Sequence, residues 1–139
     1  MNRKSLLVVS MAIILLAGFA CGKSSYSEYK GALSDLITSK EKYIADIQGA
    51  SKADDFVKAT KAYITSVKKF KEQRSSIFVK YPELTDNVAM PADVTQLLEK
   101  STKLDTDIDK VLVPAATKYQ SDPSAISTWE ELNRTRVGL

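Results

Sequence analysis

Residues 54–81 read DDFVKATKAYITSVKKFKEQRSSIFVKY, and this stretch decides the fold. Its mainly apolar positions recur at alternating steps of four and three residues, which places them on one stripe of an α-helix. The members of the stripe are Phe56, Thr60, Tyr63, Val67, Phe70, Arg74, Ile77 and Tyr81. Pro82 predicts the end of the helix, because the residue before a proline is disfavoured in the helical conformation.

Two further stripes with the same spacing flank this segment. The first runs through residues 26–47 and stops before Gly49, a residue that commonly follows a helix. Lys40 interrupts this stripe and is expected to extend its amine to solvent. The second stripe runs through residues 91–119 and contains Pro114, which cannot donate a hydrogen bond to the carbonyl four residues earlier. We therefore expect either a kink before this proline or two abutting helices.

Two helix starts can be read from short motifs. Ser51 to Asp54 resemble a capping box, with the aspartate in the place usually taken by glutamate or glutamine. Asp122 and Pro123 form a typical cap and first helical position, so a short last helix is predicted from Pro123 to about Arg134. Its apolar residues are expected to face inward, namely Ile126, Trp129 and Leu132.

These elements together predict an all-α fold. No stretch shows the two-residue alternation of a strand, and the connectors between the helical stripes are short. Long helices joined by short connectors pack as antiparallel neighbours. The sequence therefore predicts an antiparallel helical bundle of three long helices plus a short C-terminal fourth helix.

The composition excludes several kinds of active site. The chain contains no histidine and one cysteine. The lack of histidine removes the commonest general base and metal ligand, together with Ser–His and Cys–His nucleophile pairs. We therefore expect no catalytic residue, no metal site and no cofactor. An enzyme that uses lysine, tyrosine or carboxylate groups is left open as an alternative.

Three aspartates at alternate positions, Asp105, Asp107 and Asp109, resemble the start of a calcium-binding loop of the EF-hand type. Such a loop requires glycine at its sixth place and glutamate at its twelfth. Those places hold Lys110 and Ala116. Because the segment also lies within a helical stripe, we interpret these aspartates as a solvated helix face.

The N-terminal segment shows a different pattern. Arg3 and Lys4 precede an apolar run from Leu6 to Leu16, and small residues then lead to Cys21. The run is shorter than the about 20 residues of a membrane-spanning helix and fits the hydrophobic region of a signal peptide. Residues 1–25 resemble the signal peptide of a bacterial lipoprotein, in which the cysteine after a small-residue motif is lipidated and becomes the mature N-terminus.

This resemblance implies a signal peptide at 1–20, a lipidated Cys21 with a tether at 21–25, and a single helical-bundle domain at 26–139. Acyl chains such as palmitate would hold the protein on a lipid bilayer, because each buried methylene contributes about 0.8 kcal/mol. Gly22 is not the aspartate that retains lipoproteins at the inner membrane, so the outer membrane or cell surface is expected. Ordinary signal cleavage after Ala20 and an uncleaved anchor stay open.

The charges are distributed unevenly along the chain. Residues 56–81 carry seven basic side chains against Glu72 alone, whereas residues 83–109 carry seven acidic side chains against two lysines. One interpretation is that the two segments complement each other where their helices pack. The other is an anionic-surface binding site on the exposed lysines, for which the candidates are Lys58, Lys61, Lys68 and Lys69. Without Arg3 and Lys4 the net charge of +3 falls close to zero, which does not favour nucleic acid.

We therefore expect a membrane-anchored cell-envelope lipoprotein with a non-catalytic binding or scaffolding role. Its expected partners are the bilayer, through acylated Cys21, and an envelope protein or anionic polymer. The alternative is a periplasmic chaperone-like or stress-related binding module, which an apolar patch left uncovered by the fourth helix would favour. The helix pattern is also similar to small extracytoplasmic bundles of the cytochrome b562 type, but without histidine that similarity does not imply haem.

Overall fold

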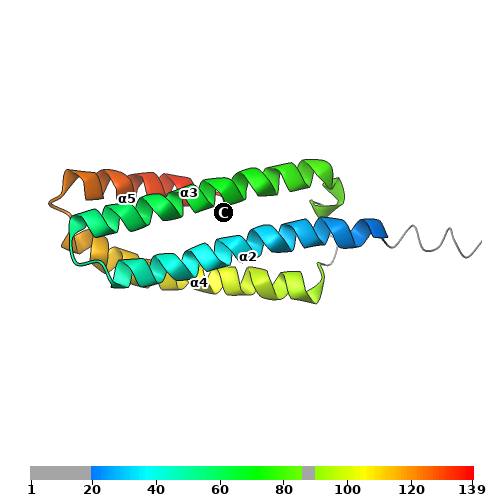
Figure 1. Cartoon of the computed structure of the whole chain (residues 1–139), viewed down its shortest axis with the longest axis horizontal. Coiled ribbons are helices and arrows are strands. Elements are labelled where there is room, and N and C mark those ends of the chain that lie inside the picture. The colour runs from blue at the N-terminus through cyan, green and yellow to red at the C-terminus, as the bar shows by residue number, and fades with distance from the viewer. Residues whose placement is uncertain (1–19, 86–89) are drawn as a thin grey trace, which may run out of the picture.

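The computed structural model of the protein describes residues 20–85 and 90–139, with side chains described from Tyr26 onward apart from Glu83. Every regular element within these ranges is helical (Figure 1). The elements are α2 (Ala20–Gln48), α3 (Ala53–Lys80), the short 3-10 helix η1 (Pro82–Leu84), α4 (Ala92–Lys118) and α5 (Pro123–Arg136). The prediction of an all-α fold is confirmed for this part of the chain.

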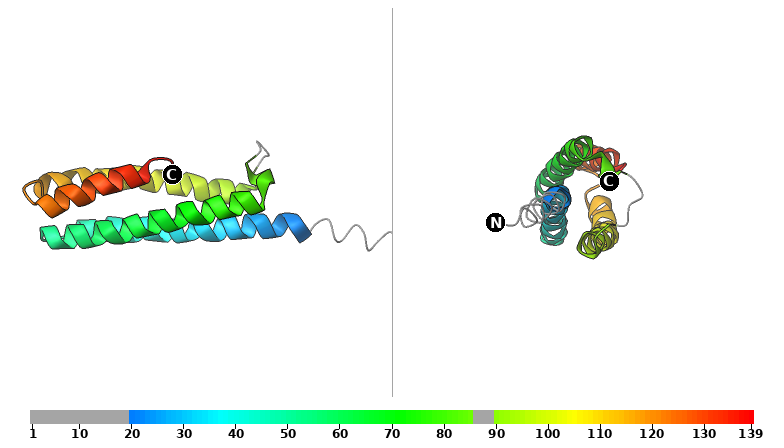
Figure 2. Two further views of the ribbon diagram at one scale, coloured as in Figure 1. Left: turned by 90° about the horizontal axis from the view of Figure 1, so that it is seen from above. Right: turned by 90° about the vertical axis from the view of Figure 1, so that its right-hand side faces the viewer.

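The helices pack side by side in the order α4, α2, α3 and α5. Helix α2 packs against both α3 and α4, whereas α5 packs on α3 and barely touches α4. In Figure 1 the colour order reverses from each long helix to the next, and Figure 2 shows the same arrangement from above and from one end. Because α5 has 14 residues and α3 has 28, α5 covers only part of the length of α3. The bundle is therefore least closed between α4 and α5.

The core contains the stripe that residues 54–81 predicted. Six of its members are buried in α3, namely Phe56, Thr60, Tyr63, Val67, Phe70 and Ile77. The rings of Tyr63 and Tyr43 stack with their centroids 4.5 Å apart, and the hydroxyl of Tyr43 lies 3.1 Å from Thr60 Oγ1. Full burial of one large apolar side chain stabilises the fold by about 1.5–3 kcal/mol, so this stripe contributes substantially to stability.

The helix ends follow local signals, with one correction. Asp122 Oδ1 accepts hydrogen bonds from the backbone amides of Ser124 and Ala125 at 2.8 and 3.0 Å, which confirms the predicted start of α5. At the start of α3 the capping acid is Asp55, not the predicted Asp54. Its carboxylate accepts from Ser51 and from the Lys52 amide, because the helix begins one residue later than the expected motif.

Two expectations about the backbone are corrected. Helix α2 begins at Ala20, so residues 21–25 are helical where a flexible tether was expected. No proline interrupts this segment, and a single glycine costs a helix only about 1 kcal/mol. Helix α4 runs as one helix through Pro114, so two abutting helices do not occur. Pro114 is exposed, and water can therefore hydrogen-bond the carbonyl that the proline leaves without a donor.

Candidate functional site

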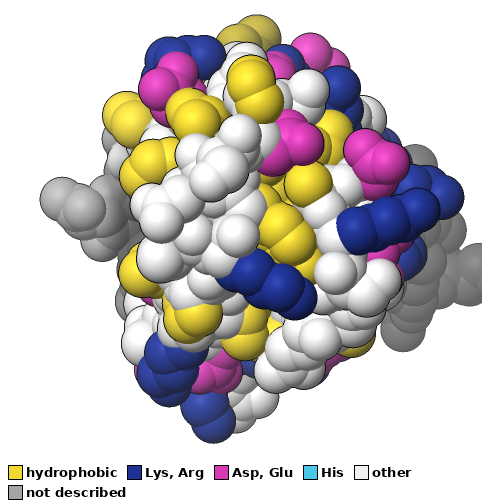
Figure 3. Space-filling model, turned by 90° about the vertical axis from the view of Figure 1, so that its left-hand side faces the viewer, with side chains coloured by type: hydrophobic (Ala, Val, Ile, Leu, Met, Phe, Trp, Pro, Cys, Tyr) yellow, Lys and Arg dark blue, Asp and Glu magenta, His cyan; other side chains and the backbone are white. Residues whose placement is uncertain are grey.

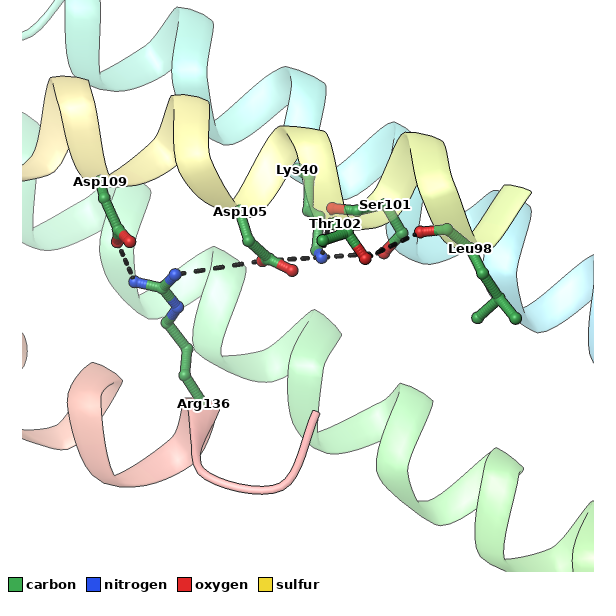
Figure 4. Close-up of polar contacts among 7 residues, drawn as sticks. All are labelled: Lys40, Leu98, Ser101, Thr102, Asp105, Asp109 and Arg136. Atoms are coloured by element: carbon green, nitrogen blue, oxygen red, sulfur yellow. Dashed lines mark hydrogen bonds and ion pairs between the residues drawn. The ribbon is translucent and has the colours of Figure 1, made fainter. Parts of the chain in front are cut away.

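A buried lysine marks the centre of the bundle. Lys40 on α2 is 1% exposed, so the expectation that its amine reaches solvent is wrong. Its Nζ donates to the backbone oxygen of Ser101 at 3.1 Å and to Ser101 Oγ at 2.9 Å, and it lies 2.7 Å from Asp105 Oδ1 (Figure 4). The partners lie on the adjacent helix α4, whose small serine leaves room for the amine.

The ionic contacts continue from Lys40 to the last helix. Arg136 of α5 lies 4.0 Å from Asp105 and 2.6 Å from Asp109, so a chain of alternating charges joins α2, α4 and α5 (Figure 4). These contacts connect α4 to α5 where the two helices otherwise barely meet. Burial lowers the pKa of Lys40, and the nearby carboxylate of Asp105 opposes that effect.

This network is built to hold a charge and not to react. Lys40 donates two hydrogen bonds to Ser101, and its ammonium charge is paired with Asp105. A lysine so enclosed is not open to a substrate. Two tyrosines pack beside it, and burial raises the pKa of Tyr43 to about 12 and raises that of Tyr63 as well. We interpret the cluster as a structural link between helices.

The register of α5 differs from the prediction. Its buried side chains are Ala125, Thr128 and Leu132, whereas Ile126 and Trp129 are 40% and 38% exposed. Leu132 faces inward as predicted. The other two were expected inward, but small residues face the core here because α5 packs closely on α3. The bulky side chains are therefore left beside α4.

The exposed side chains of α5 form one wall of a cleft. The cleft has an apolar half and a polar half. The apolar half has a volume of about 420 Å³, with Val113 and Ala116 of α4 on one side and Ile126 and Trp129 of α5 on the other. Figure 3 shows the end of the bundle that carries the α2–α3 and α4–α5 connections, where hydrophobic side chains are exposed among charged ones. We call the space between α4 and α5 the α4–α5 cleft.

The second half of the α4–α5 cleft is polar. It has a volume of about 460 Å³ and is lined by Asp105, Asp109, Asn133, Arg136, Val137 and Leu139. The residues after α5 are held against α3, because Lys71 donates to the backbone oxygen of Val137 and Arg74 donates to that of Gly138 at 2.7 Å. One helical turn separates Asp109 from Val113 and Trp129 from Asn133, so the two halves adjoin.

The four predicted surface lysines differ in their ionic partners. All four are exposed on α3, but Lys68 pairs with Glu131 of α5 at 2.8 Å and Lys69 lies 3.8 Å from Asp35 of α2. Lys58 borders the groove between α2 and α3 and therefore lies on the same side as Lys69. For the other two lysines, Lys58 and Lys61, no ion pair is found within the described residues.

The expected pairing of basic and acidic segments is also corrected. The acids that pair with lysines of α3 come from α2 and α5, through Glu28, Asp35 and Glu131. Helices α3 and α4 are not packed neighbours, so the acidic segment cannot complement the basic one directly. The acids of α4 pair with α2 and α5 or within their own helix.

The side chain of Cys21, the predicted lipidation site, lies outside the described residues, as does most of the predicted signal peptide. Among the described residues, no cluster of side chains suited to a metal ion is found. None of the helices in the described ranges combines the length and the apolar character needed to cross a bilayer. Comparison of the chain with family models, curated proteins and solved structures gave no match.

Sequence reasoning assigned Lys40 to solvent and did not predict the α4–α5 cleft. A lysine on an apolar stripe, such as Lys40, indicates a buried charge when an acid lies opposite it. The sequence alone does not show that Asp105 of α4 lies opposite Lys40. The cleft had no such signal, because it depends on which face of α5 packs on α3. Ala125 and Thr128 are too small to mark that face by hydrophobicity.

Proposed function

We propose that the protein is an exported lipoprotein of the cell envelope, anchored to a membrane by acyl chains on Cys21, with a non-catalytic binding or scaffolding role. The observation that carries this proposal is the position of the only cysteine. It stands directly after a short apolar run with a basic start and directly before a polar segment, as in lipoprotein signal peptides. Because the anchor is a lipid, the bundle itself needs no membrane-spanning helix.

The bundle in this proposal is the antiparallel arrangement of three long helices and a short fourth that the sequence predicts. Helix lengths of 29, 28, 27 and 14 residues support it, as do the directions of the ribbons in Figure 1. Helix α2 continues without a break from Cys21 to Gln48. At 1.5 Å per residue the connection between α2 and α3 is then about 40 Å from the lipidated sulfur.

This geometry decides which anionic surface the lysines could meet. Lys58 and Lys61 lie near the start of α3, at the end of the bundle far from Cys21 (Figure 1). They are about 30 Å along α3 from its membrane-proximal end, whereas salt screens exposed charges beyond about 8 Å. With the bundle upright on its lipid anchor, the bilayer is therefore out of their reach. An anionic envelope polymer is the partner that fits them.

The proposal is tested by Cys21→Ser in the native cell, with Ser24→Ala at the same boundary as a matched control. The change removes the only thiol, so labelling by a radioactive fatty acid should be lost, while the control should label like the unchanged chain. The precursor should also fail to be shortened by the lipoprotein peptidase, which requires the lipidated cysteine. Undiminished fatty-acid labelling of Cys21→Ser would refute a lipid on that residue.

A chaperone-like binding module is the second candidate, and the exposed apolar half of the α4–α5 cleft favours it. Such a protein should suppress aggregation of several unrelated unfolded proteins at equimolar amounts. Ile126→Asp should remove that activity without unfolding the bundle, because Ile126 is partly exposed. Suppression that survives this change, or an absence of suppression, would dismiss the second candidate.

A further inference from the structure

Three long helices meet at the end of the bundle where α2 begins (Figure 1). Lys80 in the last turn of α3 lies 2.7 Å from Glu28 of α2, and Lys30 of α2 pairs with Asp93 in the first turn of α4. We call the end of the bundle around these four residues the proximal end. Glu28 is the seventh residue after Cys21 in the unbroken helix α2, so the proximal end lies about 10 Å along the helix from Cys21.

The proximal end carries apolar and aromatic side chains at its surface. Val79 is 80% exposed, more than any other large hydrophobic side chain in the described ranges. Tyr26 of α2 and Phe78 and Tyr81 of α3 lie at the same end and are partly exposed. A tyrosine combines an apolar ring with a polar tip, and such side chains are enriched where a bilayer meets water. A single exposed valine is ordinary, but together with three aromatic rings it suits the interfacial layer of a membrane.

The order of the chain identifies what this surface meets. The apolar run from Leu6 to Leu16 precedes α2, so it leads to the proximal end and not to the end with the α4–α5 connection. Acyl chains on Cys21 and an uncleaved run would both place a bilayer there. Because α2 continues from Ala20 without a break, the last turn of α3 is held at a fixed distance from that bilayer.

We propose that the proximal end docks on the bilayer surface, with Val79 in the headgroup layer and Tyr26 and Tyr81 at its border. The inference rests on the proposed anchor and deepens it, because docking gives the bundle one orientation. A bilayer of about 40–45 Å with a hydrocarbon core of about 30 Å has a headgroup layer of about 5–8 Å on each side. With the sulfur of Cys21 at the inner border of this layer, an upright bundle holds Val79 near the outer border. A small tilt towards α3 brings it in.

The contact suits a neutral lipid surface. The charged side chains that define the proximal end are paired with one another, Lys80 with Glu28 and Lys30 with Asp93. These pairs leave no net charge to select an anionic headgroup, whereas burial of apolar surface does not depend on headgroup charge. Phosphatidylcholine should therefore be sufficient for docking, and added phosphatidylglycerol should not strengthen it.

The test uses the full protein from its own membranes, reconstituted in phosphatidylcholine vesicles with bromine atoms on the acyl chains next to the headgroups. Bromine quenches tryptophan fluorescence on close approach. If the intact mass shows a free Cys21 thiol, this only thiol is coupled to a maleimide phospholipid, so every sample is tethered. Phe78→Trp in a Trp129→Phe background reports on the proximal end, with Tyr26→Trp as a second reporter. Native Trp129 in the unchanged protein reports on the part of the bundle far from α2's start.

Brominated lipid should quench the tryptophan introduced by Phe78→Trp and leave native Trp129 unquenched. Addition of Val79→Asp should lower the quenching about threefold or more, because a charged group resists transfer out of water. Val113→Asp is the matched control, since Val113 is 61% exposed and lies about 30 Å along α4 from the proximal end. The control and an exchange of part of the lipid for phosphatidylglycerol should leave the quenching unchanged.

The inference is overturned if Val79→Asp leaves the quenching as it is, or if Val113→Asp lowers it as much. Quenching of native Trp129 equal to that at the proximal end would also overturn it, because the bundle would then lie on its side. Quenching that requires phosphatidylglycerol would refute the neutral contact. Every sample is tethered, so failure of docking is seen in the quenching and failure of the native lipid anchor is seen in the intact mass.

Discussion

Asp105→Asn should destabilise the protein strongly, because it leaves the Lys40 ammonium charged and buried without its counter-ion. Lys40 is 1% exposed and its pair with Asp105 spans 2.7 Å. Removal of one partner of a buried ion pair costs about 3–5 kcal/mol, which is a large share of the about 5–15 kcal/mol that stabilises a typical domain. Ser101 keeps its two hydrogen bonds to the amine but carries no charge.

The reverse change should cost less. Lys40→Met removes the buried charge and leaves Asp105, whose side chain is 34% exposed and lies 4.0 Å from Arg136. Asp105 Oδ1 is buried and loses its partner, but the rest of the carboxylate can be hydrated, so we expect a loss of about 1–3 kcal/mol. The double variant Lys40→Met with Asp105→Leu replaces the pair by apolar groups and should return close to the unchanged protein.

The pH dependence of Asp105→Asn follows from the lowered pKa of Lys40. Burial already lowers this pKa from 10.5, and removal of Asp105 should lower it further. Between the lowered folded pKa and 10.5 the unfolded chain binds more protons than the folded one, so the free energy of unfolding rises with pH. The variant should therefore recover stability as the pH approaches 10.5, and more steeply than the unchanged protein.

The assay is urea unfolding of the full chain followed by circular dichroism, at neutral pH and at several pH values up to 10.5. Asp107→Asn is the matched control, because Asp107 pairs with Lys110 within its own helix and should contribute about 0.5 kcal/mol. If Asp105→Asn unfolds within 1 kcal/mol of the unchanged protein and shows no added pH dependence, the buried-pair reasoning is refuted.

Three further predictions follow from the same geometry. Pro114→Ala restores a backbone donor inside α4 and should raise the melting temperature or leave it unchanged; a clear fall would contradict the assignment of this proline to an exposed helix position. Leu132→Ala should cost about 2–5 kcal/mol in urea unfolding and Trp129→Ala clearly less; the opposite order would contradict the register of α5. Charge reversal at Lys58 and Lys61 should weaken retention on a soluble anionic polymer but not on anionic vesicles; equal retention on the polymer would dismiss these lysines as its binding site.

The helical class and the main core could be predicted because α3 has large apolar residues at regular steps. Phe56, Val67 and Phe70 are bulky enough to define one face, and the structure buries all three. Helix ends were predicted where proline or a capping aspartate imposes them, as at Pro82 and Asp122. These signals are local, so the sequence contains them in full.

The position of α5 could not be predicted in the same way. The bulky apolar residues Ile126 and Trp129 lie on its exposed face, whereas the face that packs on α3 carries the small residues Ala125 and Thr128. Close packing on α3 selects the smaller side chains, which is a tertiary effect. The cleft and its apolar lining follow from that choice, and only the arrangement of helices in space shows them.

The most direct test of the central claim is the intact mass of the protein extracted from the membrane fraction of its own cell. The proposal predicts a chain that begins at Cys21 and carries the added mass of a diacylglyceryl group, with or without a further acyl chain on its amine. A chain that still begins at Met1, or one that begins at Cys21 with an unmodified thiol, would contradict it.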